Sequence, residues 1–162
     1  MDKAACSYWM HGFGGEPKAT AKAMRAMGFD IVVAGGAETI VAVREAGMRA
    51  WLCGGAFGIG DTEDAHKAVE ILGEPQMWFG SGSPNDPEVR AKNLESYKAM
   101  AKTEGIEGIL VDGCRYASPA SGLRAFLTDF SDHAQRAAAD LGFDFDAMKR
   151  DVRALYDLLM AK

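Results

Sequence analysis

Short apolar runs alternate with amphipathic segments along most of the chain. The runs are rich in β-forming residues and nearly continuous, which is typical of strands that are covered on both faces. They predict strands at residues 5–10, 31–34, 49–53 and 107–111, with a shorter one at 76–79. Strands that alternate with helices predict parallel βα units.

Glycines follow several of the amphipathic segments, immediately before an apolar residue and the next predicted strand. Gly28, Gly47 and Gly105 share this pattern, and glycine suits the left-handed position that ends a helix. The pattern therefore predicts helix ends at these three places.

Four helices can be placed from their ends and their apolar spacing. Pro17 suits the first turn of one helix, and Asp61 can cap a second that runs to residue 72. The turn at residues 83–87 introduces a longer third helix. Near the C-terminus an apolar stripe predicts a helix that packs on the core, formed by Met148, Val152, Leu155, Tyr156 and Leu159.

Composition places the chain among soluble globular proteins. Its 162 residues are 48% apolar and 25% charged, and no linker divides them, so a single α/β domain over residues 1–162 is expected. The net charge of -5 gives no basic surface for nucleic acid. No run has the length of a signal peptide core or a membrane span, which favours a cytoplasmic location.

The cysteines indicate neither a disulfide framework nor a zinc knuckle. Cys6, Cys53 and Cys114 are an odd number and form no Cys-x-x-Cys pair. All three are expected to be small buried hydrophobes.

Candidate functional residues lie where predicted strands end, because ligands bind at the carboxyl ends of strands in α/β folds. Asp112 directly follows the apolar run at 109–111, and Arg115 could hold its carboxylate ionised. Such an aspartate suits a nucleophile or a stabiliser of an oxocarbenium-like transition state. The alternative is an Asp–Arg pair that only fastens the loop.

Aromatic and imidazole side chains near the same loops could contact a sugar ring. They are His11, Trp51, Trp78 and Tyr116. Rings of this size are also common core residues, so each has a packing alternative.

Three segments carry a family resemblance. Residues 108–116, Gly-Ile-Leu-Val-Asp-Gly-Cys-Arg-Tyr, resemble the fourth-strand Asp-x-x-Arg-Tyr/Phe segment of glycoside-hydrolase-like barrels. Residues 78–90 are similar to the Pro-Asn-x-Pro-x-x-Arg segment that precedes that strand, and residues 126–134 stand where relatives often carry Phe-Cys-x-x-Cys. Ser131 and Ala134 replace those cysteines here.

The resemblance implies a (β/α)8-type barrel and hydrolysis or transfer at a glycosidic bond. Such barrels need about 250 residues, so a half barrel of about four strands is expected, completed by a missing C-terminal half or by a second copy. Asp112 and Arg115 would be catalytic, and His11, Trp51, Trp78 and Tyr116 would bind carbohydrate.

Other hypotheses for the function of the chain remain open. It could be a non-catalytic carbohydrate-binding or oligomerisation module, or a flavodoxin-like domain that binds a cofactor at a strand switch point. The glycine-rich loop at 11–15 is not a nucleotide fingerprint, so no cofactor is expected. Asp129, Asp132 and His133 are expected to form a helix cap rather than a metal site.

Overall fold

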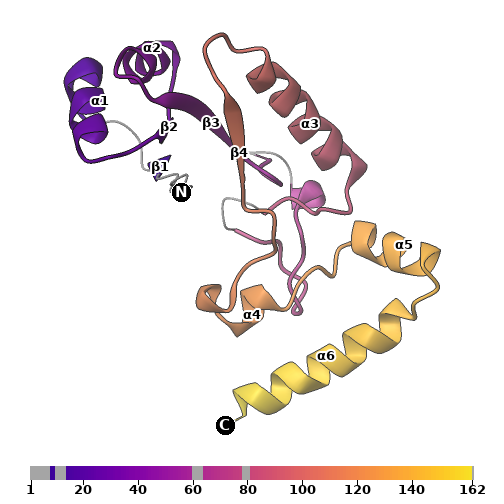
Figure 1. The fold of residues 1–162 in the computed structure, drawn as a ribbon. Coiled ribbons are helices and arrows are strands. Elements are labelled where there is room, and N and C mark those ends of the chain that lie inside the picture. The colour runs from indigo at the N-terminus through magenta and orange to yellow at the C-terminus, as the bar shows by residue number, and fades with distance from the viewer. Residues whose placement is uncertain (1–7, 10–13, 60–63, 78–80, 162) are drawn as a thin grey trace, which may run out of the picture. The chain divides into compact units, whose positions relative to one another are not determined.

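The computed structural model describes residues 8–9, 14–59, 64–77 and 81–161 (Figure 1). Its strands are β1 (Tyr8–Trp9), β2 (Ile31–Val33), β3 (Arg49–Gly55) and β4 (Gly108–Asp112). Its α-helices are α1 (Pro17–Ala26), α2 (Ala37–Glu45), α3 (Pro87–Ala101), α4 (Leu123–Phe126), α5 (Asp132–Asp140) and α6 (Phe145–Met160). Short 3₁₀ turns lie at Asp64–His66 and Pro119–Ser121. The chain divides into two compact units, each built from two segments.

The first unit, Met1–Gly54 with Ser96–Asp112, contains the sheet. Its strands follow one another in chain order, β1-β2-β3-β4, and the β1–β2 and β2–β3 pairs are parallel. The amide of Glu107 donates to the Ala50 carbonyl at 2.9 Å, which joins the start of β4 to β3. The predicted α/β class with parallel βα units is therefore confirmed.

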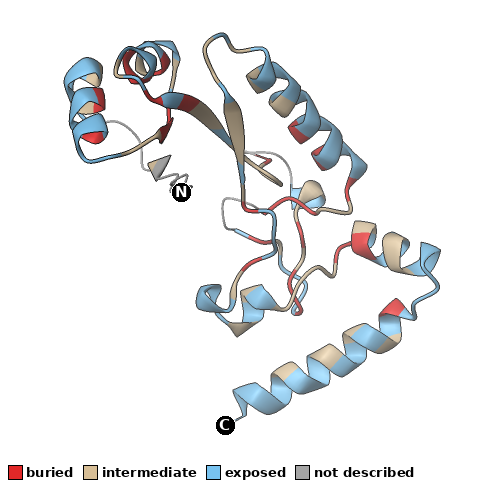
Figure 2. Ribbon diagram, viewed as in Figure 1, coloured by how far each residue is buried: buried red, intermediate tan, exposed pale blue. Residues whose placement is uncertain are grey.

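The core of this unit lies between the sheet and its first two helices. All three residues of β2 are buried, as expected for a continuous apolar strand. Helices α1 and α2 pack on each other, and Figure 2 shows their buried positions on one side of each ribbon. The buried cluster consists of Ala21, Met24, Val32, Ala34, Ile40, Ala42, Val43, Met48 and Ala50.

The helix ends predicted from glycine are confirmed at three places. Gly28, Gly47 and Gly105 have φ values of 93°, 77° and 85°. This left-handed backbone is costly for residues with a Cβ atom, which explains the glycines.

Gly108 is required for a different reason. A Cβ atom at this position would lie 2.5 Å from the Trp51 indole, which covers the strand backbone. We expect Gly108→Ala to lower the free energy of unfolding by about 1–3 kcal/mol, because the ring must shift within a packed sheet. Urea denaturation measures this loss. Gly35→Ala is the matched control, since a Cβ atom there meets open space, and an equal loss in both variants would contradict the steric cause.

The second unit, Gly55–Glu95 with Gly113–Lys162, has little regular structure in its first segment. The helix predicted at 61–72 is wrong for the residues described. Lys67, Val69 and Glu70 form isolated antiparallel bridges, to Gly82, Pro75 and Thr128. The Ala68 amide donates to the Ser81 carbonyl, so these backbone groups find partners across the chain instead of within a helix. The described part of the predicted strand at 76–79 belongs to no named strand.

Helix α6 exposes much of its apolar stripe, contrary to the expected packing on the core. Met148, Leu155 and Leu159 have 44%, 50% and 43% of their surface exposed, and only Phe145 at the helix start is buried. Phe145 contacts the Phe130 ring, with centroids 5.9 Å apart. The pattern predicted the helix correctly, but not what covers its apolar face.

The single domain over residues 1–162 and the cytoplasmic location both stay predictions. The existence of two compact units does not test whether residues 1–162 fold as one domain. Among the helices that the structure describes, none is both long enough and apolar enough to cross a membrane.

Candidate functional site

Asp112 is the last residue of β4, so it lies at a strand end as the sequence predicted, and its side chain is half-buried. Its carboxylate acts electrostatically on Cys53 of β3 in the same unit. Burial, and then the negative charge of Asp112, raises the pKa of the Cys53 thiol. Cys53 and Cys114 are exposed, so the expectation that they are buried hydrophobes is wrong, and Cys6 lies outside the described residues.

Arg115 and Tyr116 belong to the second unit, whereas Asp112 belongs to the first. The Arg115 Nη1 donates to the Tyr116 carbonyl at 2.9 Å, which holds the guanidinium against its own loop. The Asn85 amide donates to the Tyr116 hydroxyl at 3.4 Å. Desolvation, and then the charge of Asp129, raises the pKa of Tyr116. The pairing of Arg115 with Asp112 stays a prediction.

Trp51 is placed on the sheet, where its indole lies over Gly108. The indole Nε1 is buried, and no described residue accepts its hydrogen. This position favours packing, and contact with a sugar stays a prediction. His11 and Trp78 lie outside the described residues.

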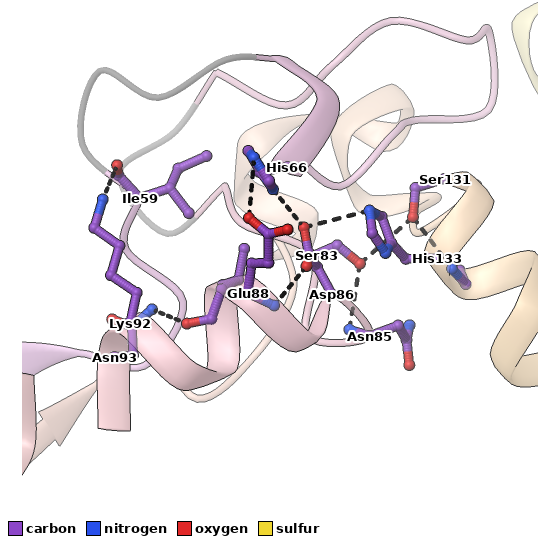
Figure 3. Close-up of polar contacts among 12 residues, drawn as sticks. Ile59, His66, Ser83, Asn85, Asp86, Glu88, Lys92, Asn93, Ser131 and His133 are labelled. Atoms are coloured by element: carbon purple, nitrogen blue, oxygen red, sulfur yellow. Dashed lines mark hydrogen bonds and ion pairs between the residues drawn. The ribbon is translucent and has the colours of Figure 1, made fainter. Parts of the chain in front are cut away.

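A buried polar group in the second unit surrounds Asp86, which immediately precedes α3. We call His66, Asp86 and His133 the Asp86 centre (Figure 3). The Asp86 side chain is fully buried, while His66 and His133 are 28% and 19% exposed. The His66 Nδ1 lies 2.7 Å from Oδ2 of Asp86, and the His133 Nε2 lies 3.3 Å from the same oxygen.

The neighbours of the two imidazoles fix their hydrogen-bonding roles. Arg136 can only donate, and its Nη2 lies 2.9 Å from Nδ1 of His133, so that nitrogen accepts. The His133 Nε2 therefore carries a hydrogen and donates to Asp86. An ionised carboxylate only accepts, so the His66 Nδ1 also donates to it.

Asp86 is held in its ionised form. Burial opposes the charge and raises the pKa of Asp86. The hydrogen bonds from His66 and the Glu88 amide, and then the electrostatic effects of His133 and His66, outweigh burial and lower the pKa. The Glu88 amide donates to Oδ1 at 2.8 Å, and the Arg90 amide donates to the Asp86 carbonyl at 3.1 Å. Asp86 thus caps α3 and gathers two distant histidines with the same carboxylate.

A second carboxylate supports the same region. Asp129 accepts from the buried Ser83 hydroxyl at 2.6 Å and from the Val69 and Ser131 amides at 3.0 and 2.9 Å. The Ser131 hydroxyl accepts from the Ala134 amide and caps α5. A helix cap is therefore present at the start of α5, but its capping residue is Ser131 and not one of the three residues expected to form it. Within the described residues no three His, Cys, Asp or Glu side chains are grouped so as to hold a metal ion.

Sequence reasoning missed His66 and Asp86. The Asp-Pro pair before a helical segment was a signal for a capping aspartate. No local pattern indicated that His66, 20 residues earlier, would bind the same carboxylate.

Comparison with known proteins identifies no relative of the chain. No protein-family model, curated protein or solved structure matches the chain.

Proposed function

We propose that the chain is a glycoside-hydrolase-like domain that acts on or binds carbohydrate. The observation that carries the proposal is the position of Asp112, at the carboxyl end of a strand in a sheet ordered β1-β2-β3-β4. Catalytic residues of (β/α)8 barrels occupy such strand ends, and strands of a barrel follow chain order. The resemblance of residues 108–116 to the fourth strand of glycosidase-like barrels points to the same residue.

The strand order favours a half barrel over a flavodoxin-like sheet. A flavodoxin-like sheet has the order 2-1-3-4-5 and binds its cofactor at the point where the winding reverses. The four described strands have no such reversal. A barrel-like winding needs further strands to close, which a second copy or a C-terminal half barrel would provide.

In the proposed reaction Asp112 supplies negative charge at the sugar. Its carboxylate acts as the nucleophile or stabilises the oxocarbenium-like transition state. Arg115 is the positioning residue proposed for this carboxylate, and Trp51, Tyr116, His11 and Trp78 are the proposed sugar contacts.

Asp112→Asn tests the catalytic proposal on the full chain. The change is isosteric and removes only the charge, so we expect hydrolysis of aryl glycosides to fall about 10²–10³-fold while thermal unfolding is nearly unchanged. Asp140→Asn, at the exposed end of α5, is the matched control and should keep full activity. Full activity of Asp112→Asn would contradict the assignment.

A non-catalytic binding or oligomerisation module is the second candidate. The exposed apolar side chains of α6, among them Leu155 and Leu158, favour it because large apolar surfaces commonly mark interaction sites. An inactive wild type that still binds carbohydrate would favour this candidate.

A further inference from the structure

A polar pocket lies within the second unit, lined by residues of the segment at 70–77 and of α4 with the turn before it. Its volume is about 540 Å³, within the roughly 300–1,000 Å³ that is typical of sites for small organic ligands. The polar part of its wall is formed by Glu70, Glu74, Gln76, Ser121 and Arg124. The pocket therefore has the size and the polar groups of a binding site.

Arg124 is held in this wall by the buried carboxylate of Glu70. The Arg124 Nε donates to Oε2 of Glu70 at 2.9 Å, and its Nη2 donates to Oε1 at 3.0 Å. The Glu70 carboxylate also accepts from the Leu72 and Glu74 amides, at 3.0 and 2.8 Å. A guanidinium has five N–H groups, so after these two bonds three more can donate elsewhere. Arg124 is thus a donor whose position is fixed and whose side chain is 48% exposed.

Gln76 brings a fixed acceptor to the same wall. The residue is 4% exposed, and its Nε2 donates to the Ala125 carbonyl at 2.9 Å. A carbonyl oxygen only accepts, so this bond settles which end of the carboxamide is the nitrogen. No described residue donates to the Gln76 Oε1. An amide oxygen of a buried residue is costly to leave without a donor, so this oxygen is suited to a hydrogen supplied by a ligand.

We propose that this pocket binds an uncharged sugar of one or two rings through its hydroxyl groups. The wall offers acceptors on Gln76 and Glu74 and a donor on Arg124, and a sugar hydroxyl both donates and accepts. Glu70 and Arg124 offset each other's charge, so Glu74 leaves the wall negative and disfavours an anionic ligand. The choice of a sugar among uncharged polyols rests on the proposed function, whereas the pocket is formed by the second unit alone.

The test is NMR of the full chain labelled with ¹⁵N, following the side-chain amide signals of glutamine as sugar is added. The chain has two glutamines, and Gln135 is exposed on α5, so it serves as a reference in the same spectrum. The probes are cellobiose, lactose and maltose, with 2-methoxytetrahydropyran as the ring that lacks hydroxyls. We expect a saturable change at Gln76 with at least one disaccharide, none at Gln135, and none with the control ring. Gln135→Ala assigns the two signals.

Glu74→Gln decides the assignment. The side chain is exposed, and the bonds that join Glu74 to Glu70 use the Glu74 backbone, so the variant keeps the fold. We expect its affinity for the sugar to be about tenfold weaker, because hydrogen bonds to a carboxylate are roughly twice as strong as those to a neutral amide. Glu104→Gln is the matched control, since it removes the same charge from an exposed residue that does not line the pocket, and its affinity should be unchanged.

The proposal is overturned if no disaccharide changes the Gln76 signals, if the control ring changes them equally, or if Glu74→Gln binds as tightly as wild type. Its outcome is separable from that of the proposed function. Hydrolysis that Asp112→Asn abolishes, together with unchanged Gln76 signals, would overturn the sugar pocket alone. Saturable binding at Gln76 by a chain that hydrolyses no glycoside would support the pocket and contradict the catalytic role of Asp112.

Discussion

Asp86→Asn is expected to lower the free energy of unfolding by about 3 kcal/mol, because it removes a buried charge that several donors share. Oδ2 accepts from His66 and His133, and Oδ1 accepts from the Glu88 amide. If the carbonyl oxygen of the asparagine keeps the bond from the Glu88 amide, its NH₂ group takes the place of Oδ2. This donor then faces the N–H groups of both imidazoles. His133 cannot reverse its tautomer without losing its bond from Arg136. One donor therefore stays unsatisfied.

Thermal unfolding measures this effect, and a loss of this size corresponds to roughly 6–12 °C in a chain of this length. Hydrogen exchange locates it, and protection should fall in residues 64–70, 83–95 and 129–136. Glu88→Gln is the control, because the side chain is exposed while its amide bond to Asp86 remains. A loss below about 1 kcal/mol would show that the Asp86 centre does not hold these segments together.

The parts of the fold that the sequence predicted are those in which neighbouring residues decide the structure. Gly28, Gly47 and Gly105 end their segments because a left-handed backbone is a property of one residue. The continuous apolar run of β2 directly indicates a strand that is buried on both faces. The start of a helix also depends on a few consecutive residues, as at Pro17, the first residue of α1.

The parts of the fold that the sequence did not predict depend on contacts between distant residues. The segment after residue 64 has the composition of a helix, yet Val69 bonds to the side chain of Asp129, 60 residues away, and Glu70 bonds to Arg124. These tertiary bonds override the local preference. The Asp86 centre has the same origin, since its three side chains come from three separate segments.

Acid is expected to destabilise the second unit through two buried carboxylates. Burial raises the pKa of Glu70, but the Arg124 guanidinium and the Leu72 and Glu74 amides outweigh it, and the pKa is lowered from 4.5. The pKa of Asp86 is likewise lowered from 3.8. A carboxyl group with a lowered pKa in the folded state stabilises the fold fully above its ordinary value. That contribution is lost as the pH falls through the lowered value. Unfolding should therefore become easier below about pH 4.

Glu70→Gln separates this linkage from a general effect of acid. Arg124 Nε lies 2.9 Å from the Glu70 carboxylate, which is 5% exposed, so the variant should lose about 1–3 kcal/mol at neutral pH. As the pH falls through the lowered pKa, wild type loses the same interaction, and the difference between the two proteins should shrink. Glu74→Gln is the matched control because that side chain is exposed. Urea denaturation at a series of pH values gives the three curves, and a constant difference between wild type and Glu70→Gln down to the lowest pH would refute the linkage.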